Sequence, residues 1–108
     1  MLTEKEILDK GFTEYKPTPF DSEAVDKRYQ KCYYRNNHKS YFLDIVHYSM
    51  THPHNGEDLS GYEIETQIYA KGTHNAINVK FLEDDIDYAE KFVNELFESG
   101  ALENYERD

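Results

Sequence analysis

The residues best suited to chemistry gather in one polar stretch, residues 51–61, where two histidines precede two acids. His52 and His54 flank a proline, and Glu57 and Asp58 follow shortly after. Imidazole and carboxylate groups are common ligands for zinc and related divalent ions. The spacing matches neither HExxH nor paired CxxC, and a polar turn explains the same residues. We therefore predict no metal or other cofactor, and an enzyme that uses His52 and His54 for a metal or small ligand is the alternative hypothesis.

The single cysteine, Cys32, is the only thiol available as a nucleophile. It falls in a tyrosine-rich stretch predicted to be a strand, where a small buried thiol is the usual interpretation. No glycine-rich elbow or helix N-terminus is placed to activate it. The GxSxG elbow, the P-loop motif and the GxGxxG motif are absent from the sequence. The sequence therefore predicts a protein without a catalytic residue, which is not an enzyme.

Acidic residues are concentrated near the C-terminus. Residues 81–108 contain ten acids and two bases, whereas residues 1–80 contain twelve acids and ten bases. The net charge of −10 argues against direct binding of nucleic acid and against docking on anionic lipid. It fits an acidic surface that docks a basic partner protein, although a solvated helix face would look the same. The candidate partner-binding acids are Glu83, Asp84, Asp87, Glu90 and Glu98.

Ten tyrosines and no tryptophan give the chain an unusual aromatic composition. A tyrosine ring is apolar with a polar tip, so it suits half-buried sheet faces and protein interfaces. The glycine and phenylalanine pattern of RNA-binding sheets is missing, so base stacking is disfavoured. The second candidate surface for a partner, or for self-association, is therefore a tyrosine-rich sheet that includes Tyr33, Tyr34 and Tyr69.

Two helices are indicated by residues typical of helix ends. Thr3 suits an N-cap with Glu6 three residues later, and Gly11 is placed to end a short helix over residues 4–10. A second helix is predicted from the N-cap Asp84 to the stop signal Gly100. Its apolar residues recur at helical spacing and form one stripe: Ile86, Ala89, Val93, Leu96 and Phe97.

Between the helices, several stretches are rich in strand-forming residues. They are residues 29–35, 41–50, 62–69 and 76–81, with 12–15 as a further short extended segment. Turn residues at 36–39 and 71–75 join two pairs of them as hairpins. This order predicts an α+β fold with a three- to four-stranded antiparallel meander and both helices packed on one face. Residues 1–108 are expected to form a single domain.

Nothing in the sequence directs the chain to a membrane or out of the cell. The first twenty residues lack the apolar core of a signal peptide. No stretch contains the roughly 20 apolar residues that a membrane-spanning helix needs. A single cysteine also forms no intramolecular disulfide. The expected location is therefore the cytoplasm.

Four stretches resemble small proteins encoded by phages and prophages of low-GC Gram-positive bacteria: residues 11–21, 29–33, 41–45 and 88–102. The resemblance rests on structural residues and transfers no functional residue. It implies an accessory protein made during phage growth, which binds and modulates or inhibits a host protein, including a protein of host defence. The principal hypothesis is therefore a non-catalytic protein-binding module that uses an acidic surface.

Overall fold

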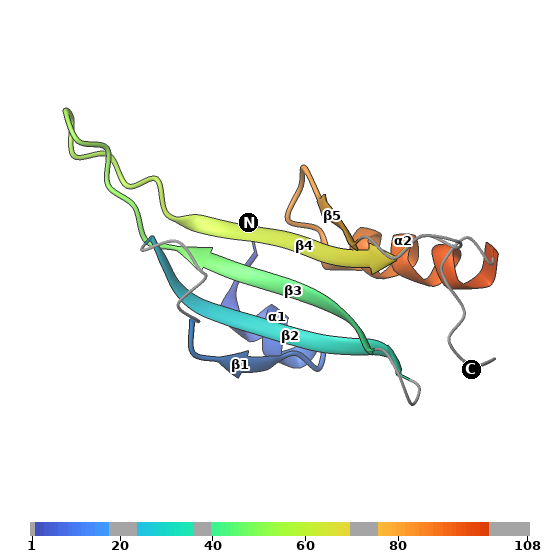
Figure 1. Ribbon diagram of the computed structural model, residues 1–108. Coiled ribbons are helices and arrows are strands. Elements are labelled where there is room, and N and C mark those ends of the chain that lie inside the picture. Colours follow the sequence, from blue (N-terminus) through green and yellow to red (C-terminus); the bar gives the residue numbers. More distant parts are fainter. Residues whose placement is uncertain (1, 18–23, 36–39, 70–75, 100–108) are drawn as a thin grey trace.

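The computed structural model describes residues 2–17, 24–35, 40–69 and 76–99. Within these ranges the chain forms two helices and a five-stranded antiparallel sheet, which confirms the predicted α+β class. The elements are α1 (Glu4–Asp9), β1 (Thr13–Tyr15), β2 (Val25–Arg35), β3 (Ser40–Tyr48), β4 (Gly61–Tyr69), β5 (Ala76–Lys80) and α2 (Ile86–Ser99). Both helices pack on the same face of the sheet (Figure 1).

The sheet is a meander in the order β1-β2-β3-β4-β5, so neighbours in the sheet are also neighbours in the chain. The four predicted strands correspond to β2 to β5, and the short extended segment predicted at 12–15 is the edge strand β1. β2 begins earlier than predicted, because Val25 already pairs with Tyr48 of β3. Three predictions lie outside the described residues: the turns at 36–39 and 71–75 and the helix stop at Gly100.

The start of α1 has the predicted cap. Thr3 has an extended backbone, and its hydroxyl oxygen accepts the Glu6 backbone N–H at 3.2 Å. Leu2 and Ile7, on either side of the cap, are both buried in the core, as a hydrophobic staple requires. The cap therefore sets both where α1 begins and which side of it faces the sheet.

The end of α1 is a Schellman motif. Gly11 has a φ of 92°, and its N–H donates to the Leu8 carbonyl at 3.0 Å. The Phe12 N–H donates to the Ile7 carbonyl at 3.3 Å, and the side chains of both residues lie in the core. The left-handed glycine thus turns the chain so that β1 can follow directly along the edge of the sheet.

The predicted N-cap of α2, Asp84, is wrong by one residue. The helix begins at Ile86, and the side chain of Asp85 accepts the Tyr88 N–H at 3.1 Å. The Asp85 carbonyl accepts the Ala89 N–H, also at 3.1 Å, as an N-cap does. The predicted apolar stripe is confirmed at its three buried positions, Ile86, Ala89 and Val93.

The core lies between the sheet and the two helices. Tyr29, Ile45 and Ile64 are fully buried at its centre and lie directly opposite one another on β2, β3 and β4. Towards the end of α2, Tyr41 packs edge-on against Phe97 with ring centroids 5.4 Å apart. Burial of apolar surface, at roughly 25 cal/mol per Å², is the main term that holds the helices on this face.

The other face of the sheet, here called the open face, is covered by neither helix and carries charged side chains. The Arg28 guanidinium lies 3.7 Å from Asp44 and 4.0 Å from Glu65, and the three side chains are only 16, 17 and 27% exposed. Burial raises the pKa of Glu65, although the Arg28 cation acts in the opposite direction. The ionised form of Glu65 is therefore less favourable here than in water.

Cys32 also lies on the open face and is exposed, so the prediction of a buried thiol is wrong. The reason is the alternation of side chains along a strand. Tyr29 points into the core, and β2 stays in register with β3 from Tyr29 to Cys32, which places Cys32 on the opposite face.

Gly11→Ala should lower the free energy of unfolding by about 1–2 kcal/mol, because a side chain is strained at positive φ. Lack of space is not the cause, since an added Cβ would meet only the Lys31 side chain, with Cε at 3.6 Å. Gly61→Ala is the matched control, because its Cβ would meet nothing within 4 Å. Chemical denaturation measures both variants, and an unchanged midpoint for Gly11→Ala would contradict the Schellman motif.

Glu65→Gln should raise the free energy of unfolding at neutral pH. Since the pKa of Glu65 is raised in the folded state, the folded protein binds this proton more tightly than the unfolded chain. Wild type therefore loses stability as the pH rises above 4.5 through the folded-state pKa, and the glutamine variant lacks this loss. Urea denaturation across pH should show a gain that vanishes well below pH 4.5. A variant less stable than wild type at neutral pH would mean that pairing with Arg28 outweighs burial.

Candidate functional site

Residues 49–60 form a hairpin arm that extends beyond the ends of β3 and β4 (Figure 1). The polar loop was predicted at 51–61, and the strand before it was predicted two residues too long, since β3 ends at Tyr48. The two sides of the arm are joined by backbone hydrogen bonds, including one of 2.9 Å from the Leu59 N–H to the Met50 carbonyl. Both of these side chains are 45% exposed. The arm therefore brings two apolar side chains, nine positions apart in the sequence, to one place beside the sheet.

His52 has a structural role at the tip of the arm. Its ring nitrogen Nδ1 accepts the backbone N–H groups of His54 and Asn55 at 3.2 and 3.4 Å. The His52 and His54 rings lie close, with centroids 5.8 Å apart. In the described ranges, however, no group of three His, Cys, Asp or Glu side chains is placed to hold a metal ion. The geometry thus gives His52 a place in the turn and adds no third ligand from the described chain.

Three of the five predicted partner-binding acids contact other parts of the chain. The contacts are Asp84 with the Leu2 N–H (3.0 Å), Asp87 with Lys10, and Glu90 with the Lys31 ammonium (3.4 Å). They connect the start of α2 to α1 and to β2. These acids hold the helices in place, so changing them would test the fold as well as binding.

The other predicted residues are spread over the molecule. Glu83 and Glu98 are exposed, but Glu83 lies on the connection before α2 and Glu98 lies in the last turn of that helix. Tyr33 faces the helices and packs against the core, where burial and the nearby Glu90 carboxylate raise the pKa of its hydroxyl. The side chains of Tyr34 and Tyr69 lie outside what the structure describes. The predicted acids and Tyr33 therefore do not form one continuous surface.

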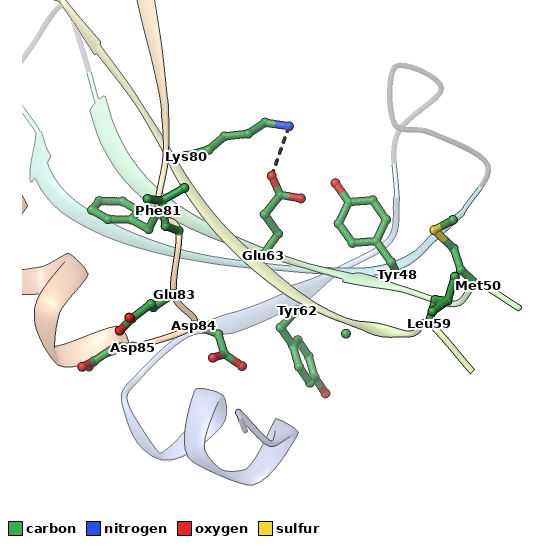
Figure 2. A pocket seen from close by; sticks show the side chains of 12 residues that line it. Tyr48, Met50, Leu59, Tyr62, Glu63, Lys80, Phe81, Glu83, Asp84 and Asp85 are labelled. Atoms are coloured by element: carbon green, nitrogen blue, oxygen red, sulfur yellow. Dashed lines mark ion pairs between the residues drawn. The ribbon is translucent and has the colours of Figure 1, made fainter. Parts of the chain in front are cut away.

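A cleft of about 970 Å³ opens where the base of the arm, the start of β4 and the connection from β5 to α2 meet (Figure 2). We call it the junction cleft. Met50 and Leu59 line it from the arm, and Phe81 and Leu82 line it from the connection. Tyr48 also lines it, and burial together with Glu63 raises the pKa of this phenol, which therefore stays protonated at neutral pH. The cleft thus has apolar walls, and the Tyr48 phenol in its lining is engaged by Glu63.

The charges around the junction cleft are mostly negative. Its lining contains one ammonium, Lys80, and four carboxylates: Glu63, Glu83, Asp84 and Asp85. Lys80 lies 3.1 Å from Glu63, and this contact raises the pKa of the ammonium (Figure 2). One carboxylate is therefore balanced by a neighbouring cation, and the others give the cleft a net negative charge.

Leu82 is the most exposed large apolar side chain of the described chain, with a relative exposure of 103%. It lies between the junction cleft and a second hollow of about 440 Å³, which is lined in part by Phe81, Tyr88 and Phe92. Tyr88 is itself 60% exposed. A single exposed leucine is ordinary. Leu82, however, lines both hollows together with other apolar side chains, and contiguous exposed apolar patches commonly mark contact sites.

Comparison of the chain with protein-family models, with curated protein sequences and with solved structures found no match. None of the described helices is both long enough and apolar enough to cross a membrane.

Two of the four acids of the junction cleft, Glu83 and Asp84, were predicted as binding residues, and none of its apolar walls was predicted. Leu82 gave a usable signal, because it stands among acids and belongs neither to the alternation of the last strand nor to the helical stripe. Met50 and Leu59 gave no such signal, because they are brought together only by the pairing of the two sides of the arm. The sequence indicates acids near the start of α2, whereas the shape of the cleft is visible only in the structure.

Glu90→Lys should lower the free energy of unfolding by about 1 kcal/mol or more, since it replaces an ion pair with two like charges at a partly buried position. The Glu90 and Lys31 side chains are only 23 and 30% exposed. Glu95→Lys, at a carboxylate that is 63% exposed on the same helix, is the control and should change stability by no more than about 0.5 kcal/mol. Equal thermal denaturation midpoints for the two variants would contradict the role of Glu90 in holding α2.

Proposed function

We propose that the protein is a non-catalytic binding module that docks a partner protein at the junction cleft. The observation that carries the proposal is Leu82, a fully exposed apolar side chain between two hollows and next to carboxylates. Docking surfaces commonly combine an apolar centre, which contributes affinity, with a charged rim. Here the apolar centre is formed by Leu82, Phe81 and Met50, and the charged rim is formed by Glu83 and Asp85.

The charge of the surface favours a basic partner. The whole chain carries a net charge of −10, and the cleft has four carboxylates against one ammonium. Such a field raises the rate of association with a positively charged partner and disfavours acidic ones. A partner surface with lysine or arginine around an apolar residue would complement the cleft in both respects.

The resemblance to phage-encoded accessory proteins supplies a biological setting for the proposal. In that setting the protein acts in the host cytoplasm, and its partner is a host protein whose activity is modulated or inhibited. Proteins that normally hold nucleic acid are suitable partners, because their binding surfaces are basic. Proteins of host defence that act on nucleic acid belong to this group.

Capture from host lysate on the immobilised protein tests the proposal. Leu82→Ser should reduce recovery of the partner about tenfold, as loss of a central apolar contact does. Because the Leu82 side chain is fully exposed, the variant should unfold at the same temperature as wild type. Quantitative mass spectrometry of the captured proteins is the measurement.

Leu8→Ser is the matched control, since Leu8 is also exposed, at 44%, but does not line the junction cleft. It should capture the partner as wild type does. Raising the ionic strength should release the partner from wild type, since salt screens exposed charges. If Leu82→Ser and Leu8→Ser capture the same proteins in the same amounts, the junction cleft is not the docking surface.

A further inference from the structure

The junction cleft contains an open strand edge. β5 pairs with β4 from Glu65 to Tyr69, and beyond this the Phe81 N–H donates to the Ile64 carbonyl at 2.9 Å. The chain then leaves β4 towards α2. Within the described chain, the first residues of β4, 61–63, therefore have a strand partner only on the β3 side. On the cleft side, this part of β4 is an edge.

The alternation of hydrogen bonds shows which residue presents its backbone to the cleft. In an antiparallel strand, the N–H and C=O of one residue point to the same side, and those of the next residue point to the other. The backbone N–H and C=O of Ile64 point towards β5, because the carbonyl accepts the Phe81 N–H. The backbone N–H and C=O of Tyr62, two residues earlier, point to the same side, where the cleft lies. Tyr62 thus offers a donor and an acceptor to an incoming chain.

Side chains on both sides of this edge are placed to contact such a chain. Figure 2 shows Glu63 on one side of β4, with Lys80, and Asp84 on the other side, near Tyr62. An extended segment alternates its side chains between these two sides. Adjacent basic residues would therefore lie beside Glu63, which also contacts Lys80, and beside Asp84, which also accepts the Leu2 N–H. Apolar residues at the two ends of the segment would contact Leu59 of the arm and the apolar part of the connection.

We propose, on the basis of the docking function above, that the partner enters the junction cleft as an extended basic segment that adds a strand to the start of β4. Strand addition supplies main-chain hydrogen bonds for affinity, while the flanking side chains supply selectivity. Here Tyr62 supplies the hydrogen bonds, and Glu63 and Asp84 select lysine or arginine. The apolar walls of the cleft shield these bonds from water.

The probe for the test is the capped peptide acetyl-Val-Lys-Arg-Lys-Val-amide. Its binding is followed by NMR of the whole protein, with amide hydrogen exchange as the readout. Exchange of the Tyr62 amide should slow on peptide binding, because it gains an acceptor. Exchange of the Glu63 amide should change little, because its backbone N–H points to β3. An equal effect on both amides would contradict the proposed alternation.

Two N-methylated versions of the peptide separate strand addition from simple charge attraction. One carries methyl groups on the backbone nitrogens of the second and fourth residues, and the other on those of the first, third and fifth, so that each removes the residues' N–H donors from one side of the extended segment. One version should bind about tenfold more weakly and the other about as well as the parent, because only one side meets β4. Equal affinity for all three peptides would overturn strand addition and leave docking at the cleft intact.

Variants of the protein complete the test. Glu63→Gln should weaken binding of the parent peptide, and Glu95→Gln, with the same charge change outside the cleft, should not. Failure of the parent peptide to bind at millimolar concentration would overturn strand addition, whereas the docking function is judged separately by the Leu82→Ser capture experiment. Slow exchange of Tyr62 that appears on concentrating the protein alone would identify a second copy as the strand and would also overturn the proposal.

Discussion

The apolar face of the sheet has to be covered by two short helices, and the rest of the structure depends on how this is done. α1 has only six residues, so it has little stability of its own and is placed by its contacts with the sheet. The Tyr29 ring is fully buried beneath it, and the Tyr29 hydroxyl donates to the Glu4 carboxylate at 2.5 Å. Lys27 donates to the same carboxylate at 2.7 Å. The position of α1 in turn determines where Leu2 meets Asp84, at the side of the junction cleft.

The sequence was sufficient to predict most of the fold, because the signals that define it are local. Capping residues around Thr3 and Gly11, the alternation in β4 and the apolar stripe of α2 each depend on neighbours only a few residues away. Two errors have one origin, which is that the sequence does not show which contacts a residue makes across the fold. Asp84 looks like a helix cap but accepts the Leu2 N–H, and Cys32 looks like a core residue until Tyr29 fixes the face of β2.

The candidate site was less predictable for the same physical reason. The sequence shows many acids near α2, but Asp87 and Glu90 reach back to Lys10 at the end of α1 and to Lys31 of β2, so their charge is partly balanced within the molecule. The apolar walls of the cleft come from the arm and from the β5–α2 connection, which are remote in sequence. The open edge of β4 follows only from β5 being shorter than its neighbour. A binding surface made of gaps between elements leaves little trace in a linear pattern.

The bond between Leu2 and Asp84 joins residues that are 82 positions apart, and this separation bears on the order of folding. Strands of a meander meet their neighbours after closing only short loops, whereas contact between the two helices requires nearly the whole described chain. We therefore expect the sheet to assemble first and the helix layer to close over it last. Until that closure, the face carrying Ile45 and Ile64, which are both fully buried in the folded protein, is open to water.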